Sequence, residues 1–497
     1  MCSSDLDFLN GIVWSNALVY LCLLAGVYFS VLLKFPQVRL VKNMAQLLFN
    51  GESSDEGVSS FQGFAMALGG RVGTGNIAGV ATAIAMGGPG AVFWMWAIAL
   101  LGAGSAYIEA ALAQVYKERI DGEYRGGPSY YIEHGLGIKW FAVAFAISAV
   151  VACGIFLPGV QSNSIASAVQ QAFNISPMIT GGIVVALLGF VVFGGTKRIG
   201  NAAAMIVPVM AGIYIIIALI IVVLNISEVP RVFGLIFSSA FGVQPVFGAI
   251  IGTAIQWGVK RGIYSNEAGQ GTGPMAAAAA EVSHPAKQGL VQAFSVYVDT
   301  LFVCSATAFM IIITGMYNVV NPAGGFLVEN IPGVQYGPAF TQLAVDTLIP
   351  GFGQGFVAIA LFFFAFTTLM AYYYYAETNV AYLTRNMQNH KMWIMLTRLG
   401  MLGMTYFGAV RTADLAWALG DLGVGVMAWL NIVAIIMLTK TGVATLTDYE
   451  AQMKEGKDPV FRPDTLGIKN AGLWNDIVKE KRSEERRVGK ECRSRWS

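Results

Sequence analysis

Long apolar runs separated by short polar segments make up most of the chain. A helix rises about 1.5 Å per residue, so roughly 20 apolar residues are enough to cross the hydrocarbon core of a bilayer. The pattern therefore predicts an all-α polytopic membrane protein. We expect eleven spans, at approximately 11–33, 60–85, 90–115, 139–159, 178–195, 200–224, 243–259, 289–316, 351–375, 392–408 and 413–439.

The second run contains GGRVGTGNIAG at 69–79, where five glycines lie beside Thr74 and Asn76. In hydrocarbon an unsatisfied backbone group costs several kcal/mol, so an unwound segment persists only where protein or a polar cavity surrounds it. Unwinding at Gly73 to Asn76 would free N–H groups that suit a carboxylate and carbonyls that suit a cation. The alternative is that the glycines allow close helix packing, but Thr74 and Asn76 favour a binding site.

A second glycine-rich stretch, GAIIGTAIQWG at 248–258, begins the seventh run and includes Gly252 and Thr253. Spans 2 to 6 and 7 to 11 would then form a 5+5 inverted repeat, in which each half opens with a broken helix. The first span is an extra amino-terminal helix. Corresponding interruptions of this kind indicate the midplane site of a transporter.

Composition agrees with a membrane protein, since 56% of the 497 residues are hydrophobic and only 12% are charged. Residues 441–497 hold 22 of the 60 charged residues. The net charge is +2, and no basic face lies outside this tail, so nucleic acid is not an expected partner. The five cysteines include no CxxC pair and indicate neither a disulfide framework nor a metal site.

Charge placement predicts the orientation in the membrane. The first span has no basic segment before it and is followed by Lys34, Arg39 and Lys42, so it is a retained span with an outside amino terminus. Basic residues, among them Lys260 and Arg261, then concentrate in segments assigned to the inside. The positive-inside rule therefore places the carboxyl terminus in the cytoplasm.

The composition also divides the chain into three parts. These are a short amino-terminal segment at 1–10, a transmembrane transporter domain at 11–440 and a cytoplasmic charged tail at 441–497. We expect MCSSDL at the start and the end of the tail to be disordered, with non-native sequence as the alternative. A transport defect after deletion of 483–497 would contradict this interpretation.

Two long motifs, GGPGAVFWMW at 87–96 and YSNEAGQGTGPMAAAAAEVSHPAKQG at 264–289, closely resemble the alanine or glycine:cation symporter family, as does RVGTGNIAGVATAIAM before the first. The resemblance covers roughly residues 11–450 and implies sodium-coupled import of alanine or glycine on the leucine-transporter-like fold. It also implies that Thr74, Gly75 and Asn76 meet the substrate carboxylate. The partners would be a small neutral amino acid, sodium and the lipid bilayer, with no cofactor, for a monomer in a bacterial-type plasma membrane.

Further candidates follow from the same resemblance. Gln161 resembles the family's pocket glutamine, and its alternative role is a hydrogen bond between helices. Thr367 and Thr368 stand where the related fold supplies hydroxyls to sodium, with the carbonyls of Gly69 and Val72 as further ligands. Their alternative is bonding to the preceding turn of their own helix.

Three more residues complete the predicted substrate site. Gly252 and Thr253 would line it from the second glycine-rich stretch. Phe366 would cap the small side chain of the substrate, although packing is the favoured role in so aromatic a run.

Few ionisable residues fall inside the predicted spans, and the three histidines lie in predicted cytoplasmic segments. A proton relay needs buried Asp, Glu or His, so sodium coupling is favoured over proton coupling. Glu109 and Asp299 are exceptions. Arg71 beside the break is expected in a structural ion pair, and Asp299 is a guess for its partner.

Two functional classes stay open: a secondary symporter, and an ion channel or structural membrane protein. A channel usually lines its pore with rings of charge or repeated carbonyls, whereas two unlike breaks in one chain favour alternating access. An enzyme is not expected, since the glycines at 266–274 lack the GxxxxGK[ST] pattern of a phosphate loop. This segment, on the predicted cytoplasmic side, is instead interpreted as the end of a broken helix and an inner gate.

Overall fold

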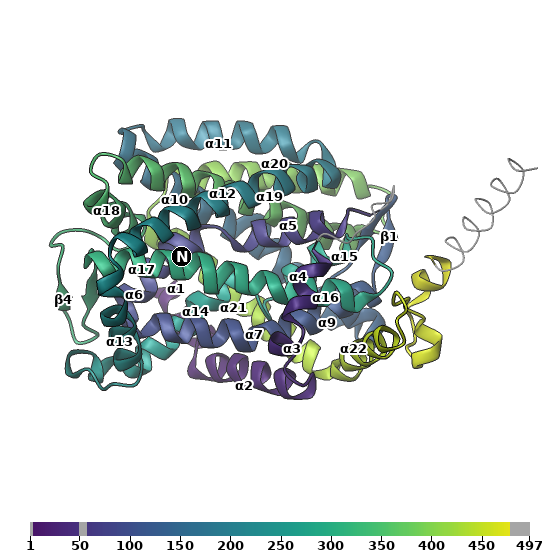
Figure 1. The fold of residues 1–497 in the computed structure, drawn as a ribbon. Coiled ribbons are helices and arrows are strands. Elements are labelled where there is room, and N and C mark those ends of the chain that lie inside the picture. Colours follow the sequence, from purple (N-terminus) through teal and green to yellow (C-terminus); the bar gives the residue numbers. More distant parts are fainter. Residues whose placement is uncertain (1–2, 49–56, 478–497) are drawn as a thin grey trace, which may run out of the picture.

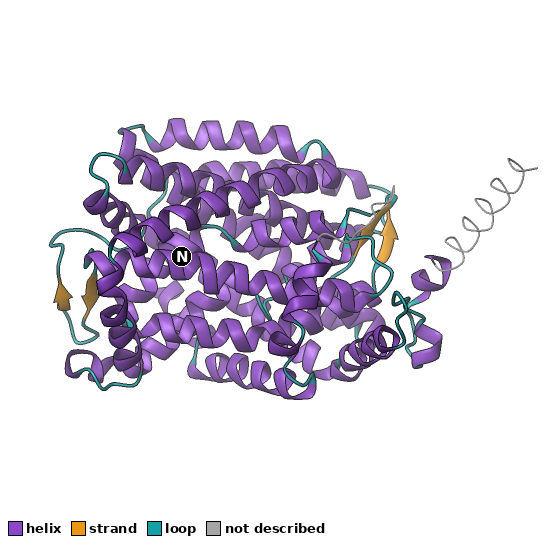
Figure 2. Cartoon of the chain, viewed as in Figure 1, coloured by secondary structure: helices purple, strands orange, loops and turns teal. Residues whose placement is uncertain are grey.

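The computed structural model describes residues 3–48 and 57–477, and it shows long helices running side by side between two ends (Figures 1 and 2). Hairpin β1–β2 and α22 lie at one end, whereas α13 and hairpin β3–β4 lie at the other. Short π-helical segments, named η1, η2, η3 and η6, interrupt several of the helices.

The bounds of the elements are as follows. The helices are α1 (Ser3–Val13), α2 (Asn16–Leu32), α3 (Pro36–Arg39), α4 (Val41–Leu47), α5 (Ser60–Arg71), α6 (Val80–Gly87), α7 (Gly90–Val115), α8 (Pro128–Tyr131), α9 (Lys139–Val151), α10 (Leu157–Phe173), α11 (Pro177–Val192), α12 (Gly195–Leu224), α13 (Val229–Ala240), α14 (Ile251–Asn266), α15 (Gly273–Ala278), α16 (Pro285–Val296), α17 (Ser305–Thr314), α18 (Pro338–Leu348), α19 (Gly353–Thr384), α20 (His390–Ala409), α21 (Ala413–Met437) and α22 (Thr439–Lys454). The π segments are η1 (Gly75–Gly79), η2 (Ile132–Leu136), η3 (Ala152–Phe156) and η6 (Tyr297–Cys304). Two antiparallel hairpins pair β1 (Glu118–Ile120) with β2 (Glu123–Arg125) and β3 (Asn318–Val320) with β4 (Phe326–Glu329).

Within the described residues, seven helical stretches are long and apolar enough to cross a membrane. They coincide with seven of the eleven predicted spans, and two shorter apolar helices, Gly75–Gly87 and Pro177–Val192, accompany them. A mostly helical, multi-pass membrane protein is therefore confirmed. The number eleven stays a prediction. The seven stretches are Asp5–Leu32, Gly90–Val115, Lys139–Phe173, Gly195–Leu224, Pro285–Thr314, Gly353–Thr384 and Ala413–Met437.

The helices differ in how they meet the surrounding lipid. On α12, Met205, Val209, Ile213 and Ile216 form an exposed apolar stripe at helical spacing. On α19, by contrast, the four tyrosines at 372–375 are all buried, so this helix lies inside the bundle. Apolar residues all round a helix are typical of such a central position.

Small residues bring the central backbones close together. A Cβ added at Gly258 of α14 would stand 2.5 Å from the carbonyl oxygen of Ala91 on α7. One added at Gly262 would stand 2.4 Å from Cγ2 of Ile98. Without side chains at these two positions, α14 packs directly on α7, as helices in membranes commonly do.

The interruption of the seventh run lies later than predicted. Helix α14 is regular through Gly252 and Thr253, and the Thr253 hydroxyl donates to the carbonyl of Ile250 at 2.8 Å. The chain leaves the helix only after Asn266. An isolated glycine is tolerated within a helix, whereas Gly269 and Gly271 adopt φ values of 82° and 90° that require glycine. The second break is therefore at 267–272.

Both ends of the chain differ from the simplest expectation. Residues 3–6, expected to be disordered, belong to α1, where Leu6 is buried and Asn10 donates to the carbonyl of Ala418 at 2.9 Å. The disorder prediction is wrong there because α1 packs on α21. In the tail, Trp474 is buried and donates to the carbonyl of Gln114 at 2.8 Å. The expected disorder at 479–497 lies outside the described residues.

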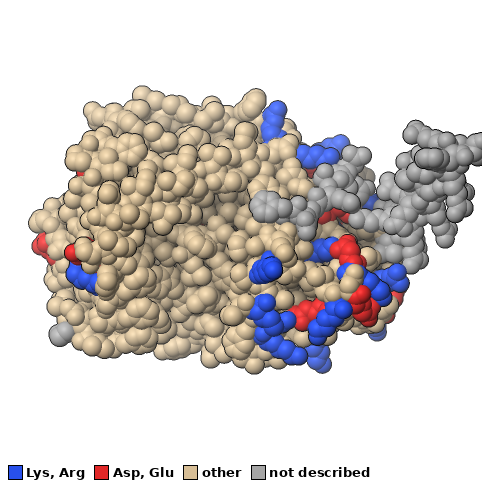
Figure 3. Space-filling model, viewed as in Figure 1, with Lys and Arg blue, Asp and Glu red and all other residues tan. Residues whose placement is uncertain are grey.

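Basic side chains gather mainly at the end of the molecule with hairpin β1–β2 and α22, and few reach the opposite end on the face shown in Figure 3. Lys260 and Arg261 are not part of this group. Both are buried in the bundle, where they form ion pairs with Asp421 at 2.8 Å. Their assignment to an inward-facing loop is wrong, because α14 continues past them into the interior.

Candidate functional site

The predicted interruption of the second run is present, between α5 and η1. Helix α5 ends at Arg71, and Val72 takes the non-helical angles φ −75° and ψ 86°. Two N–H groups freed by the break are held by side-chain oxygens: Oδ1 of Asn76 accepts from Gly73 at 2.8 Å, and Oε1 of Gln161 accepts from Thr74 at 3.1 Å. These acceptors stand where a carboxylate would bind a helix start.

Two glycines make the break compact. A Cβ at Gly73 would lie 2.3 Å from Oγ1 of Thr368, and one at Gly75 would lie 3.1 Å from Cα of Ser265. The first glycine therefore brings the break against α19, and the second brings it against α14. The two interrupted helices and the helix of the predicted sodium ligands meet at this point.

This contact leads to a prediction about two glycines. Gly73→Ala should reduce alanine uptake at least tenfold, because its Cβ would collide with Thr368 and overpacking costs about 1–3 kcal/mol. Gly252→Ala should keep uptake within about twofold, since no atom lies within 4 Å of its added Cβ. Uptake by each variant, normalised to the protein in the membrane, tests the pair. A severe loss in Gly252→Ala would restore that residue to the site.

A buried carboxylate lies directly beside the break. Asp299 of η6 accepts from Nδ2 of Asn76 at 2.6 Å, from Ser265 at 3.0 Å and from Thr300 at 2.7 Å. All four residues are completely buried. Three side-chain donors thus satisfy this buried carboxylate. Asn76 thus connects the break to Asp299 through one amide group.

Arg71 does not pair with Asp299. Its Nη1 donates to the side-chain oxygen of Gln292 at 3.2 Å and to the hydroxyl of Ser295. Among the described residues Arg71 forms no ion pair, so the guess that Asp299 is its partner is wrong. The reason is that Asn76, Ser265 and Thr300 already surround that carboxylate.

Thr367 and Thr368 both face the carbonyl of Gly69. Oγ1 of Thr368 lies 2.8 Å from this oxygen and Oγ1 of Thr367 lies 3.4 Å from it. Each hydroxyl also donates to the carbonyl of Phe364 on its own helix, at 3.1 and 2.9 Å. Val72 lies at the break, three residues after Gly69. Hydroxyl and carbonyl oxygens are hard ligands, so this group has the chemistry of a sodium site.

The remaining predicted residues make their contacts elsewhere. Phe366 stacks on Phe362 of its own helix, with ring centroids 5.9 Å apart. Thr253 lies beside the end of α6, where its carbonyl would be 3.2 Å from a Cβ at Gly87. The structure thus brings Gly69, Val72, Thr74, Gly75, Asn76, Gln161, Thr367 and Thr368 to one place, whereas Thr253 lies at the end of α6 and Gly252 is next to it in α14. Phe366 directly precedes Thr367 on α19, and its role as a cap of the substrate stays a prediction.

An ion-paired group that the sequence did not predict lies beside η1, where a Cβ at Gly79 would stand 3.9 Å from Cδ of Arg261. Asp421 of α21 receives both Lys260 and Arg261, and the guanidinium of Arg261 lies 4.3 Å from the ring centroid of Trp417. These residues line a cavity of about 790 Å³ that reaches α1 and α18. Asp421 could have been recognised from the sequence, because it is an acidic residue within an apolar run. Burying such a residue in a membrane costs free energy, and residues of this kind are usually functional.

The second break is held by α7 and α21. Glu109 accepts from the N–H of Gly269 at 3.2 Å and from Nδ2 of Asn431 at 2.7 Å. Asn431 also donates to the carbonyl of Gly269 at 2.9 Å. Glu109 and Asn431 therefore satisfy backbone groups that unwinding leaves unpaired.

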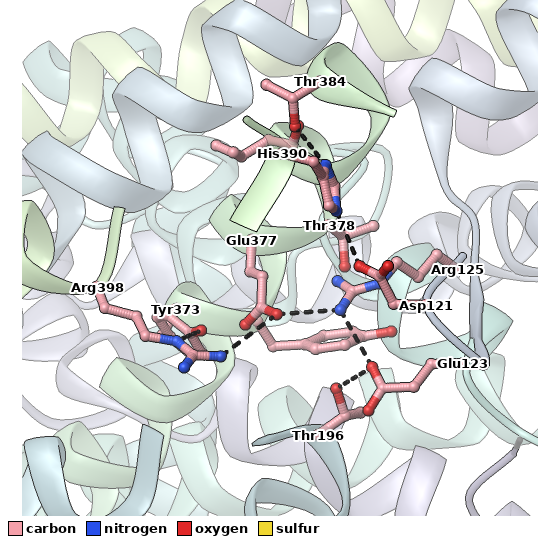
Figure 4. A network of polar contacts seen from close by, with 12 residues as sticks. Asp121, Glu123, Arg125, Thr196, Tyr373, Glu377, Thr378, Thr384, His390 and Arg398 are labelled. Carbon is pink, nitrogen blue, oxygen red and sulfur yellow. Dashed lines mark hydrogen bonds and ion pairs between the residues drawn. The ribbon is translucent and has the colours of Figure 1, made fainter. Parts of the chain in front are cut away.

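A polar network anchors the end of the bundle at hairpin β1–β2 (Figure 4). Arg125 of β2 joins Glu123 at 3.1 Å and Glu377 of α19 at 3.0 Å. Glu123 accepts from Thr196 of α12 at 2.8 Å, and Arg398 of α20 lies 3.8 Å from Glu377. The hairpin is thus tied to three helices, so movement at this end requires several of these contacts to separate.

At the same end, His284 joins α16 to α22. Its Nδ1 accepts from the N–H of Ala286, so its Nε2 carries the hydrogen that Asp448 receives at 3.1 Å. This hydrogen bond lowers the pKa of Asp448, while burial lowers the pKa of His284. The pair is a neutral imidazole on a carboxylate and acts as a structural contact.

Comparison with known proteins identifies the family. The family model described as the sodium:alanine symporter family matches residues 1–463, so the chain belongs to this family of transporters. YrbD of Bacillus subtilis (strain 168), whose name describes a sodium/proton-dependent alanine carrier, is 62% identical over 97% of this chain and 98% of its own.

Two further relatives bear on the substrate. A sodium/proton-dependent alanine carrier protein of Bacillus sp. (strain PS3) is 52% identical over 88% of this chain and 98% of its own. GlnT of Bacillus subtilis (strain 168), whose name describes a sodium/glutamine symporter, is 43% identical over 92% of each chain. The resemblance predicted from the motifs is confirmed, and the family consists of symporters and not of enzymes.

Proposed function

We propose that this protein imports alanine together with sodium by alternating access. The proposal rests on one observation: groups that suit an anion and groups that suit a cation lie together at one helix break. N–H groups of Gly73 and Thr74, which the side-chain oxygens of Asn76 and Gln161 hold here, would suit a carboxylate, and oxygens of Gly69 and Thr368 suit a cation at the same break. Binding both ligands at one place couples their affinities.

We propose eleven membrane crossings arranged as a 5+5 inverted repeat. Four helical units would add to the seven long stretches, namely α5 with α6, α11, α14 with α15, and α20. The two interrupted units, α5 with α6 and α14 with α15, would each open one repeat, which supports a transporter with its site between them. The candidate site draws on one chain alone, so a monomer would suffice.

The orientation is also a proposal. Basic side chains gather at the end with α22 (Figure 3), which supports a cytoplasmic carboxyl terminus and an outside amino terminus. The cavity beside Asp421 would then be the outer vestibule, and the network of Arg125 would hold the inner side closed. The relatives from Bacillus support a bacterial-type plasma membrane.

A small neutral substrate suits the buried break. Asp299 is already held by Asn76, Ser265 and Thr300, and Arg71 donates to Gln292 and Ser295, so neither charge is freely available to a substrate side chain. Lysine or glutamate would lose water there without a partner. Alanine is preferred to glutamine because the relatives named for alanine are the more similar ones.

Uptake of labelled alanine by proteoliposomes tests the proposal. With equal pH on both sides, we expect accumulation that requires an inward sodium gradient, strong competition by unlabelled alanine or glycine, and little competition by lysine, glutamate or glutamine. Conductance that needs no amino acid would favour the channel alternative. Glutamate or glutamine competing as strongly as alanine would overturn the assignment of a small neutral substrate.

A further inference from the structure

The second helix break carries a buried acid whose carboxylate is not hydrogen-bonded. Glu267 follows the last residue of α14 and adopts the left-handed φ of 56°, which is uncommon for a residue other than glycine. It is completely buried. Neither of its carboxylate oxygens has a hydrogen-bond partner among the described residues.

Other polar groups in this break are unsatisfied as well. They are Nδ2 of Asn266, both amide atoms of Gln270 and the hydroxyl of Thr272. Buried polar groups in native proteins normally have partners, and the exceptions tend to mark functional positions. The break around Glu267 is therefore unlike the first break, where side chains take up the freed groups.

The number of buried acids near Glu267 exceeds the number of buried basic groups. Three buried acids, Glu109, Asp299 and Glu267, lie around one guanidinium, that of Arg71. Asp299 and Glu109 each accept formed hydrogen bonds from neighbouring donors, whereas the donor beside Glu267, the Thr272 hydroxyl, makes no formed hydrogen bond to it. A buried negative charge without formed hydrogen bonds or a close cation is costly, so the excess falls on Glu267.

The groups that face Glu267 come from every neighbouring element. Those whose charge or ionisation interacts with Glu267 include Arg71 of α5, Glu109 of α7, Asp299 of η6, Cys153 of η3, and Tyr372 and Tyr375 of α19, with Tyr264 on its own helix. Only Arg71 is basic, and it forms no ion pair with Glu267. Two acids therefore work against ionisation of the third.

The close packing around Glu267 favours a proton over a metal ion as its ligand. A Cβ built at Gly70 would stand 2.6 Å from the hydroxyl of Tyr375 and 3.3 Å from Oε2 of Glu267. At Gly273 it would stand 2.5 Å from Nη2 of Arg71. A proton occupies this closely packed region without moving any group, whereas a metal ion needs several oxygens arranged around it.

We propose that Glu267 binds a proton that is carried inward with alanine and sodium. The carboxylate would take a proton from a hydronium ion reaching it from outside, which forms an O–H bond and leaves one water molecule. After the inner side opens, the O–H bond breaks and a cytoplasmic water accepts the proton. The inference rests on the proposed alanine and sodium symport. Two relatives are named as sodium/proton-dependent carriers, and what is added for this chain is the residue that binds the proton, Glu267.

The experiment uses the full chain in proteoliposomes with equal sodium on both sides and the membrane potential clamped. With the outside one pH unit more acidic, wild type should accumulate labelled alanine, up to about tenfold for one proton per alanine. A trapped pH dye should report acidification of the lumen that requires alanine. Glu267→Gln should lose both signals, and Glu267→Asp should keep them in part because it still titrates.

The exposed Glu329 on β4 provides the matched control, and Glu329→Gln should behave as wild type. If wild type shows sodium-driven uptake but neither proton-driven accumulation nor lumen acidification, the proton site is overturned while the symporter stands. Retention of both proton signals by Glu267→Gln would overturn the proton site in the same way. Absence of sodium-driven uptake in wild type would instead overturn the proposed function.

Discussion

Replacement of Asn76 by alanine is expected to lower sodium-driven alanine uptake at least 100-fold, although the protein should still reach the membrane. The side chain has two roles, because its Oδ1 holds the N–H of Gly73 and its Nδ2 donates to Asp299. Losing both contacts leaves a buried donor and a buried carboxylate less satisfied, at about 1–3 kcal/mol each. About 2.7 kcal/mol corresponds to a 100-fold change.

Uptake by wild type and variant at matched protein level in the membrane measures this effect. Asn225→Ala is the matched control, since that amide only donates to the carbonyl of Ile221 at the end of α12 and should keep near-normal uptake. Asn76→Ala with normal uptake would assign Asn76 to helix packing. Failure of the variant to reach the membrane would assign it a structural role alone.

The first break shows why sequence could predict part of the site. Glycines and polar side chains inside an apolar run conflict with a regular membrane helix, and this conflict can be recognised without any structure. The sequence predicts the break at Gly73 to Asn76, and it lies at Val72 and Gly73. The approach of Gln161 and Thr368 to the break could not be read from spacing, because it depends on how distant helices pack.

The second break shows the limit of composition. Gly252 and Thr253 stand out as a glycine and a hydroxyl in an apolar run, yet a helix accommodates both. The backbone angles of Gly269 and Gly271 decide where the helix ends, and sequence does not state them. For the same reason the sequence pattern places Glu267 in a cytoplasmic segment, although it is buried beside Arg71.

The positions of charged residues in the sequence were the least reliable guide to where those residues lie in the fold. Lys260 and Arg261 have the composition of a cytoplasmic loop, but in the fold they neutralise Asp421 inside the bundle. A count of basic residues along the sequence cannot show that some of them are buried in ion pairs. The preference for sodium over protons depends on there being few buried ionisable groups, and Glu267 and Asp421 weaken it.

Thr368→Val should raise the sodium concentration needed for half-maximal alanine uptake roughly 5- to 150-fold. Valine keeps the shape of threonine while removing the oxygen that lies 2.8 Å from the carbonyl of Gly69. Loss of one ligand would cost about 1–3 kcal/mol of ion binding. Thr367→Val should have the smaller effect, because its hydroxyl lies 3.4 Å from the same oxygen and 2.9 Å from the carbonyl of Phe364.

Because alanine and sodium share one coupling energy, the Thr368 variant should bind alanine weakly at low sodium and recover much of that affinity at high sodium. Alanine uptake across a sodium series measures both midpoints. Thr405→Val is the matched control, since this buried hydroxyl bonds only to the carbonyl of Met401 on its own helix. If Thr367→Val and Thr368→Val share the sodium midpoint of wild type and Thr405→Val, the hydroxyls serve only to bond the preceding turn and the cation binds elsewhere.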